Sequence, residues 1–417
     1  MESKISWNSA TITFLLFALC SGAAAYDALD PKGNITIKWD VVSWTPDGYV
    51  AVVTMNNFQM YRPITNPGWT LGWTWAKNEV IWSMLGAQAT DQGDCSKFRS
   101  NMPHSCEKSP EIVDLLPNTP YNQQVANCCT GGVLASRGQD PSASVSAFQI
   151  AVGSAGTTNR TVKLPKNFTL DAPGDGYICG PAKVVSPSIF ITPDQRRITR
   201  AMMTWRVICT YSQFLASPKP TCCVSLSSFN SSNSQDRSYT PCPLCSCGCE
   251  NISNCVMKTP SEQVVNKGAL KCTKYMCPIN VHWHVNSNFK RWWGVKITIT
   301  NLNYVFNYRQ WTLIVQHPYL NNATQVPAFS YKPHMPNLSN NDTALFYGRK
   351  PYTDVLMQAG PNGNVHSDLT PNKDGKKLDQ KKGWAFPQRV YFNGNPCVMP
   401  SPESYPFVPD PVHGRDR

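Results

Sequence analysis

The stretch ITIKWDVVSWTPDGYVAVVTM, residues 35–55, decides the fold class of this chain. Apolar side chains occupy every second position on both sides of the turn-forming segment Thr45-Pro46-Asp47-Gly48, and a β-strand places alternate side chains on one face. The apolar positions are Ile35, Ile37, Trp39 and Val41 before the turn and Tyr49, Ala51, Val53 and Met55 after it. The stretch therefore predicts two successive strands, each with one apolar face.

The same period of two recurs in the second half of the chain, at Val295, Ile297 and Ile299 and at Trp311, Leu313 and Val315. The 34 prolines and 25 glycines separate such runs, as in Asn393-Gly394-Asn395-Pro396, and long stretches with a helical period are few. A length of 417 residues suffices for two or three domains. The sequence predicts a mainly β protein with two β-sandwich-like domains joined by a Cys-rich segment.

Shifts in composition set the expected boundaries, because serine, asparagine, proline and cysteine replace the alternating apolar pattern after the first domain. We expect a signal peptide at residues 1–25, an N-terminal domain at 26–214, a Cys-rich joint at 215–255, a C-terminal β domain at 256–400 and a polar tail at 401–417.

The N-terminus has the features of a secretory signal peptide. Lys4 precedes an apolar run from Ile12 to Leu19, and Ala23-Ala24-Ala25 supplies the small residues of a cleavage site. The run is shorter than the roughly 20 residues that span a bilayer. We therefore expect cleavage before Tyr26 and secretion. Tyr405 to Arg417 is polar and charged, so we expect no second membrane segment and no signal for a glycolipid anchor in this chain.

Cysteines and glycosylation motifs also indicate a secreted protein. Of 17 cysteines, Cys20 leaves with the signal, and we expect the remaining even number to pair in an oxidising environment. These are Cys95, Cys106, Cys128, Cys129, Cys179, Cys209, Cys222, Cys223, Cys242, Cys245, Cys247, Cys249, Cys255, Cys272, Cys277 and Cys397. Asn-x-Ser/Thr motifs predict N-glycosylation at Asn34, Asn159, Asn167, Asn230, Asn251, Asn322, Asn337 and Asn341.

The net charge of +12 is spread over the chain except for a cluster at Lys373, Lys376, Lys377, Lys381 and Lys382. A secreted glycoprotein rarely meets nucleic acid, so we expect no nucleic-acid partner. An acidic wall polymer or an anionic membrane surface is the better partner for the cluster, and a solvated loop is the simpler explanation.

The joint holds Cys222-Cys223-Val224-Ser225, Cys242-x-x-Cys245, Cys247-x-Cys249 and Cys255. In a cytosolic protein this pattern would indicate zinc, but the signal peptide favours disulfides. Adjacent cysteines such as Cys128-Cys129 and Cys222-Cys223 rarely bond to each other. We expect each to have a different partner, and we expect the bridges of the joint to fix the orientation of the two domains.

Aromatic residues are dense between Trp39 and Trp82. In Trp69-Thr70-Leu71-Gly72-Trp73-Thr74-Trp75 a strand would place the three tryptophans and Leu71 on one face, with Trp73 and Trp75 roughly 6.6 Å apart. A sugar ring stacks its C–H face on an indole while its hydroxyls need polar partners. The predicted glycan-binding residues are Trp44, Tyr49, Trp69, Trp73 and Trp75, with Asp40, Asp47, Asn56, Asn57, Gln59 and Asn66 as polar partners. The alternative is that the rings form the core; we expect Trp44, Tyr49, Trp69 and Trp75 to be the exposed ones.

Signatures of catalysis are missing from the sequence: it has no Gly-x-Ser-x-Gly, no His-Glu-x-x-His and no Gly-rich phosphate loop. His282-Trp283-His284 would place two imidazoles on one strand face, but a metal site needs a further ligand, so we interpret them as ordinary strand histidines. We expect a non-enzyme without metal or cofactor, although chance carboxylate pairs leave a glycosidase open.

Several longer motifs resemble those of the plant COBRA family. They are Tyr26-Asp27-Ala28-Leu29-Asp30-Pro31, Gly33-Asn34-Ile35-Thr36, Trp44-Thr45-Pro46-Asp47-Gly48-Tyr49, Leu71-Gly72-Trp73-Thr74-Trp75, Gln92-Gly93-Asp94-Cys95, Pro120-Tyr121-Asn122-Gln123-Gln124 and Cys222-Cys223-Val224-Ser225. The resemblance implies an N-terminal module similar to cellulose-binding modules, binding of cellulose or another wall β-glucan, and a role in cellulose deposition and oriented cell expansion.

The resemblance also implies a location in the cell wall or at the outer face of the plasma membrane, where family members are held by a glycolipid anchor. Contact with the cellulose synthase complex, as a scaffold, is the alternative function. This sequence departs from the family pattern in ending before an anchor tail and in carrying Ser105, before Cys106, where relatives often have a second cysteine.

Overall fold

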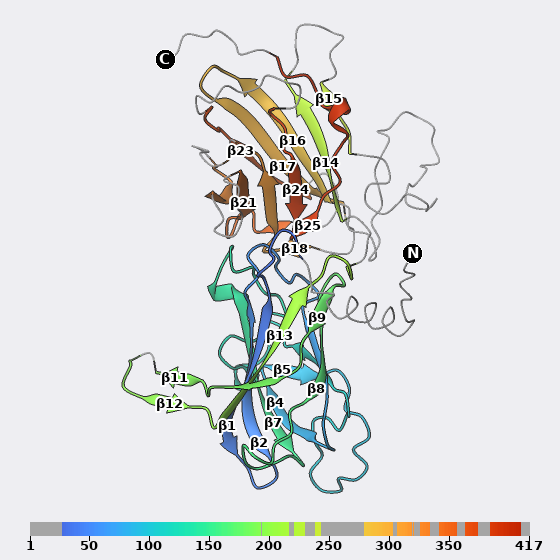
Figure 1. The fold of residues 1–417 in the computed structure, drawn as a ribbon, viewed down its shortest axis with the longest axis vertical. Helices are drawn as coiled ribbons and strands as arrows, with labels where there is room; N and C mark the ends of the chain where they lie inside the picture. The colour runs from blue at the N-terminus through green and yellow to red at the C-terminus, as the bar shows by residue number, and fades with distance from the viewer. Residues whose placement is uncertain are drawn as a thin grey trace, which may run out of the picture.

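The computed structural model describes residues 27–192, 194–216, 221–229, 238–242, 279–302, 307–318, 320, 326–333, 342–356, 363–373 and 384–409. Nearly all of its regular structure is β-strand, gathered into two domains that stack end to end along the long axis of the molecule (Figure 1). The mainly β, two-domain architecture predicted from the sequence is confirmed. The predicted signal peptide lies outside the described residues.

Domain one is a sandwich of two antiparallel sheets. The larger sheet has the strand order β10-β13-β1-β2-β7-β4, with β9 also paired to β13, and the smaller has the order β5-β6-β3-β8. The strands are β1 (Ile35–Trp44), β2 (Tyr49–Asn57), β3 (Thr70–Thr74), β4 (Val80–Leu85), β5 (Ala87–Ala89), β6 (Glu111–Asp114), β7 (Val145–Gly153), β8 (Lys166–Asp171), β9 (Tyr177–Cys179), β10 (Lys183–Val185) and β13 (Met203–Tyr211).

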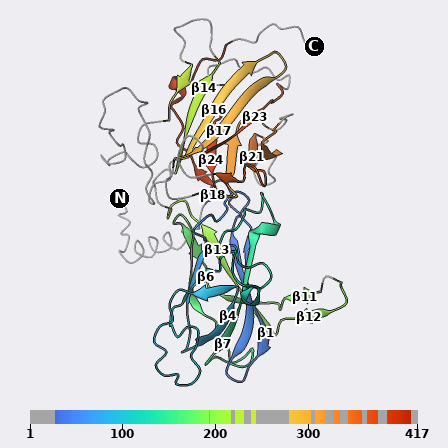
Figure 2. The ribbon, with the colours of Figure 1, turned by 180° about the vertical axis from the view of Figure 1, so that it is seen from behind.

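Short helices and a separate hairpin complete domain one. The 3₁₀ turns are η1 (Tyr121–Gln123) and η2 (Ser142–Ser144). The hairpin consists of β11 (Ile189–Ile191) and β12 (Ile198–Arg200), which pair with each other alone. In both views it projects sideways from the body of the domain (Figures 1 and 2).

The alternation in residues 35–55 sets the face of the sheet that is buried. Ile35, Ile37, Trp39 and Val41 of β1 are all at most 1% exposed, and β2 follows the same pattern. β1 and β2 pair in antiparallel register, with Ile37 opposite Met55 and Trp39 opposite Val53. The predicted hairpin is confirmed, and its apolar face meets the smaller sheet in one continuous core.

Domain two is a second sandwich, with sheets of order β15-β14-β16-β17-β23 and β20-β21-β19-β24-β25 and the pair β18-β22. Its elements are β14 (Cys222–Ser228), β15 (Tyr239–Thr240), β16 (Ile279–Asn288), β17 (Trp293–Asn301), β18 (Tyr308–Arg309), β19 (Thr312–Gln316), β20 (Phe329–Pro333), β21 (Thr343–Gly348), β22 (Val355–Leu356), β23 (Asn364–Leu369), β24 (Arg389–Phe392), β25 (Asn395–Pro396) and η4 (Pro402–Ser404). The runs at 295–299 and 311–315 lie in or next to β17 and β19 as predicted, and their apolar side chains are fully buried.

The segment predicted to be a joint contributes a strand to domain two. β14 contains Cys222-Cys223-Val224-Ser225 and runs parallel to β16, with Val224 opposite Val281. Val224 and Leu226 are fully buried in the core of that domain. Because this stretch alternates too weakly to stand out from its cysteine-rich surroundings, its strand character was missed. Residues 243–278, the rest of the joint and the start of the predicted C-terminal domain, lie outside the described residues.

Five disulfides are described: Cys95–Cys106, Cys128–Cys129, Cys179–Cys209, Cys222–Cys397 and Cys223–Cys242. Cys222 and Cys223 bond to different partners, as predicted. The expectation that Cys128 and Cys129 do so is wrong, because these neighbours bond to each other, with Cys129 at a φ of 70°. The described bridge cysteines of the joint also remain within domain two, so these bridges do not hold the domains together. Cys245, Cys247, Cys249, Cys255, Cys272 and Cys277 lie outside the described residues.

Buried side chains of both domains instead form the interface. Leu29 and Tyr61 of domain one pack with Ile314 and Leu345 of domain two. The hydroxyl of Thr312 donates a 2.7 Å hydrogen bond to the backbone carbonyl of Tyr61. The candidate site lies at the same interface between the domains. No helix among the described residues is long and apolar enough to cross a membrane.

Candidate functional site

The rings predicted to bind glycan lie mainly in the core of domain one. Tyr49, Trp69, Trp73 and Trp75 are each 2% exposed, and Trp44 is half-buried against the same core. Trp73 lies edge-to-face against Trp39 and Trp75, with ring centroids 5.1 and 5.3 Å away. The expectation that Tyr49, Trp69 and Trp75 are exposed is therefore wrong, because Tyr49 lies on the buried face of β2, and Trp69 and Trp75, which flank β3, pack into the same core.

The polar residues predicted as partners of those rings do not gather at one site, and several already hydrogen-bond to other protein groups. Asp40 is buried and accepts a hydrogen bond from Thr204, and Asp47 accepts one from the indole of Trp82. Asn57 donates to the backbone carbonyls of Arg62 and Ala135. Asn56 lies on the outer face of β2, while Gln59 and Asn66 lie near the contact with domain two. Ring stacking on the predicted row is not available in this fold.

The two histidines of His282-Trp283-His284 lie on one face of β16, as predicted, and Trp283 points into the core. A chain of hydrogen bonds joins them to β14: Ser225 Oγ lies 2.8 Å from His282 Nδ1, and Ser227 Oγ lies 2.9 Å from His282 Nε2 and 2.7 Å from His284 Nδ1. Burial and the neighbouring His284 lower the pKa of His282 to about 4. Within the described residues no group of three metal-ligating side chains comes together.

A pocket of about 250 Å³ lies between the domains. Its lining residues are Arg62, Pro63, Thr65, Asn66, Pro67, Ala172, Pro173, Gly174, Tyr177 and Tyr211 from domain one and Thr221, Ile279, Tyr308, Phe392, Asn393 and Asn395 from domain two. Ligand sites often occur at such domain boundaries. The pocket therefore depends on both domains being in place.

Arg62 is the polar centre of this pocket. The residue is 6% exposed, and its guanidinium lies 3.5 Å from the ring centroid of Tyr211. Nη2 lies 3.3 Å from Asp27 Oδ2, while Nη1 donates a 2.6 Å hydrogen bond to the side chain of Asn395. Nε, in contrast, has no partner within the described structure. Arg62 thus connects Asp27 at the start of domain one with the last hairpin of domain two.

The turn between β24 and β25 brings the backbone of domain two to Arg62. Asn393 and Gly394 have φ angles of 49° and 80°, the left-handed conformations that Asn-Gly hairpin turns adopt. The carbonyl of Gly394 accepts a 2.8 Å hydrogen bond from Nη2 of Arg62. A Cβ added at Gly394 would lie 3.0 Å from Cζ of Arg62, so the close approach also favours glycine.

Aromatic rings and amides make up the rest of the wall. Tyr177 and Tyr211 have ring centroids 5.5 Å apart, and Tyr308 meets Phe392 edge-to-face at 5.5 Å. The phenol of Tyr177 accepts a 2.8 Å hydrogen bond from Gln59, and burial raises the pKa of Tyr177 to about 12. Of the described residues that line the pocket, Arg62 alone is charged, and Asp27 partly offsets that charge. The chemistry suits a neutral polar ligand with an apolar ring face.

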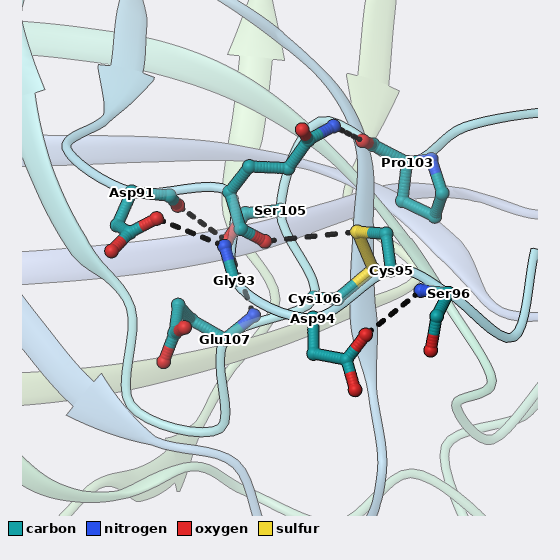
Figure 3. The surroundings of a disulfide bond; sticks show 10 residues. Asp91, Gly93, Asp94, Cys95, Ser96, Pro103, Ser105, Cys106 and Glu107 are labelled. Atoms are coloured by element: carbon teal, nitrogen blue, oxygen red, sulfur yellow. Dashed lines mark hydrogen bonds between the residues drawn. A yellow bond between two sulfur atoms is a disulfide. The ribbon is translucent and has the colours of Figure 1, made fainter.

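Ser105 lies in domain one beside the bridge Cys95–Cys106 (Figure 3). The hydroxyl of Ser105 donates a 2.9 Å hydrogen bond to the backbone carbonyl of Asp91 and accepts one from the backbone N–H of Glu107. Ser105 is 1% exposed. The buried hydroxyl of Ser105 thus links the backbone of Asp91 to that of Glu107. Cys106, the next residue, forms the disulfide with Cys95.

Three predicted glycosylation positions are described. Asn159 and Asn167 are exposed, whereas Asn34 is half-buried and donates a hydrogen bond to the carbonyl of Lys32. Glycosylation at each of them stays a prediction. Asn230, Asn251, Asn322, Asn337 and Asn341 lie outside the described residues, as do Lys376, Lys377, Lys381 and Lys382 of the basic cluster.

Comparison with known proteins adds the evolutionary context of these two domains. A model of the COBRA N-terminal domain matches residues 49–212, and a model of the COBRA family C-terminal domain matches residues 258–406. The chain belongs to the COBRA family. COBRA-like protein 4 of Arabidopsis thaliana is 60% identical over 411 residues, which cover 96% of this chain and 94% of that protein. Protein COBRA of Arabidopsis thaliana is 56% identical, with 98% of this chain and 92% of that protein covered. COBRA-like protein 5 of Oryza sativa subsp. japonica is 54% identical, with 96% and 93% covered.

COBRA family membership confirms the resemblance carried by the sequence motifs. Sequence reasoning missed the interdomain pocket, because Arg62, Tyr211 and Asn395 are far apart in the chain. The sequence does identify Asn393-Gly394 as a turn, but it does not indicate that this turn contacts Arg62 in the pocket.

Proposed function

We propose that this COBRA family protein is a non-catalytic extracellular glycoprotein that binds cellulose or a related β-glucan of the plant cell wall. Through that binding it contributes to cellulose deposition, microfibril organisation and oriented cell expansion. It works in the wall or at the outer face of the plasma membrane. The proposal joins the family membership to the chemistry of the interdomain pocket.

The observation that carries the proposal is the composition of the pocket wall. Rings of Tyr177, Tyr211 and Tyr308 lie beside amides of Asn66 and Asn395 within one cavity. A glucan unit offers an apolar C–H face to rings and hydroxyls to amides and to a guanidinium. A neutral chain suits the pocket better than an acidic one, because Asp27 already accompanies Arg62. The pocket would accept a chain end or a single protruding unit of a glucan.

The same wall favours binding over hydrolysis. Cleavage of a glycosidic bond normally requires two carboxyl groups flanking the bond. No Asp or Glu is among the described residues that line the pocket. Asp27, the nearest carboxylate to Arg62 in the hydrogen-bond network, also accepts hydrogen bonds from Leu29 and Gln213 and is 7% exposed. A bound glucan would be held without a general acid and base in place.

Glucan titrations with two pocket variants test this proposal. We expect the secreted full chain to bind soluble cello-oligosaccharides and to sediment with insoluble cellulose. Tyr308→Ala removes a ring and Asn66→Ala removes an amide, and each should weaken oligosaccharide binding about fivefold. Matched controls are Tyr121→Ala, which removes a ring that is 90% exposed, and Asn56→Ala, which removes an amide on the outer face of β2.

The possible outcomes distinguish an error in the binding site from an error in the function. If the parent binds glucan and the folded pocket variants bind equally well, the pocket is not the site. If the parent binds no glucan but co-purifies with the cellulose synthase complex, the scaffold function replaces the proposed one. Release of shorter sugars from any glucan would contradict the non-catalytic role.

A further inference from the structure

The β11–β12 hairpin stands away from domain one and exposes an apolar face. Ile189 pairs with Arg200, and Ile191 pairs with Ile198. Directly opposed residues of an antiparallel pair share a face. Ile189, Ile191 and Ile198 therefore lie on the same face of the hairpin, with Arg200 beside them. The projecting position of this hairpin can be followed in Figures 1 and 2.

The three isoleucines are unusually accessible. Their exposed fractions are 55% for Ile189, 59% for Ile191 and 69% for Ile198, although isoleucine is one of the residues most often buried. Phe190 on the opposite face is 38% exposed, and Met202 just beyond the hairpin is 54% exposed. A contiguous exposed apolar surface in a soluble domain usually marks an interaction site.

The base of the hairpin is fixed to the large sheet of domain one. The backbone N–H of Ser188 donates a 3.1 Å hydrogen bond to the hydroxyl of Thr204. The backbone N–H of Met202 donates a 2.7 Å hydrogen bond to the carbonyl of Val41, and Ala201 donates one to the carbonyl of Ser188. The hairpin is therefore held in a defined direction, although its own two strands are too short to be stable alone.

Positive charge surrounds the apolar face. Arg196, Arg197 and Arg200 are all exposed, and the acidic residue on the hairpin is Asp194. The Arg196 Nε atom lies 4.0 Å from Asp194 Oδ2, a distance that gives only a weak exposed pair. Within the described residues no ion pair involves Arg197 or Arg200. The hairpin thus presents isoleucine side chains together with unneutralised guanidinium groups.

We propose that this hairpin docks the protein on a lipid surface that carries anionic headgroups. The isoleucines would enter the boundary between headgroups and acyl chains while the arginines bond to headgroup phosphates. This docking does not depend on glucan binding, because the hairpin and the pocket share no residue.

Two other occupants fit the charges and the apolar face less well. An acidic polysaccharide would neutralise the arginines but leave the isoleucines in water. A second copy of the chain would cover the isoleucines, but a two-fold interface would also bring arginines of both copies into one patch with only Asp194 from each to offset them. A lipid surface satisfies both features at once.

Vesicle flotation of the full chain tests the proposal. We expect the protein to float with vesicles of phosphatidylcholine and phosphatidylserine and to bind much more weakly to phosphatidylcholine alone. Ile189→Thr, Ile191→Thr and Ile198→Thr together keep β-branched residues in the strands and should reduce binding at least tenfold. Arg196→Gln, Arg197→Gln and Arg200→Gln together should reduce it by about fivefold per arginine and remove the preference for phosphatidylserine.

A matched control removes equally exposed side chains elsewhere. Leu116→Thr and Tyr352→Thr replace residues that are 70% and 82% exposed, and they should leave vesicle binding unchanged. The proposal fails if the parent does not bind either kind of vesicle, or if the folded hairpin variants bind as the parent does. It also fails if the isoleucine variant instead abolishes a concentration-dependent dimer, because the face would then be an interface between copies.

Discussion

The tryptophan cluster of domain one and the pocket between the domains use aromatic rings in opposite ways. In the cluster, Trp39, Trp73 and Trp75 pack edge-to-face and no more than 2% of each is exposed. Their indole N–H groups have no hydrogen-bond partner within the described structure. In the pocket, the phenol of Tyr177 is bonded to Gln59, and Tyr211 carries a guanidinium on its face.

This difference separates rings that pack wholly within one core from rings that lie beside polar groups at a cavity. The cluster is buried, and its ring contacts lie within one domain. The pocket combines rings with polar groups from two domains around a cavity. Aromatic density in a sequence therefore does not identify a glycan-binding surface unless the polar partners lie beside the rings.

Truncating a ring of the cluster should have the largest effect on stability. Trp73 contacts Trp39, Trp75 and Phe168, so Trp73→Ala should lower the free energy of unfolding by about 5 kcal/mol, measured by chemical denaturation. Trp44→Ala, at a half-buried ring, should cost clearly less. Equal small losses in both variants would contradict the assignment of Trp73 to the core.

Removing Arg62, which lies in the interdomain pocket, should have the next largest effect on stability. Arg62→Ala leaves Asp27 buried without its ion pair and should lower the free energy of unfolding by about 4 kcal/mol. Because Arg62 bonds to both domains, limited proteolysis between them should also become faster. Arg206→Ala, at an exposed position on β13, is the control and should change neither measurement.

A buried histidine provides a pH test in the core of domain two. His317 is fully buried against Trp293, and burial lowers the pKa of His317 to about 4. The unfolded chain binds this proton near pH 6.5, so stability is greatest above 6.5 and falls as the pH drops toward 4, by about 3 kcal/mol for this group.

Thermal unfolding at several pH values would measure this loss. His317→Gln should flatten the dependence between pH 6.5 and 4, whereas His366→Gln, at an exposed position, should not. An unchanged slope in His317→Gln would mean that the buried imidazole is not the group that couples protonation to unfolding.

The smallest expected effect, about 1 kcal/mol or less, concerns the salt dependence of glucan binding. Stacking and neutral hydrogen bonds involve no net charge, so binding of cello-oligosaccharides should change less than threefold between low salt and 1 M salt, where the Debye length is about 3 Å. Attraction of an acidic polymer to Lys373 and its neighbours in sequence should fade over the same range. Isothermal titration at both salt concentrations distinguishes the two modes.

Much of the fold could be predicted from local patterns. The alternation of Ile35, Ile37 and Trp39 identifies both the strand and the residues that share its buried face, because the side-chain period of a strand is two. The Asn393-Gly394 turn was equally readable, because its φ angles require such residues. The family could be recognised from motifs such as Cys222-Cys223-Val224-Ser225.

The sequence by itself determined the β architecture, the two-domain organisation and the family. Only the tertiary structure decided that Trp69, Trp73 and Trp75 face inward, that Cys128 bonds to Cys129 and that β14 joins domain two. A strand offers two faces, and which one is buried depends on the sheet that covers it. The pocket likewise required the packing of two domains, because the distance between Arg62 and Asn395 along the chain says nothing about their contact in space.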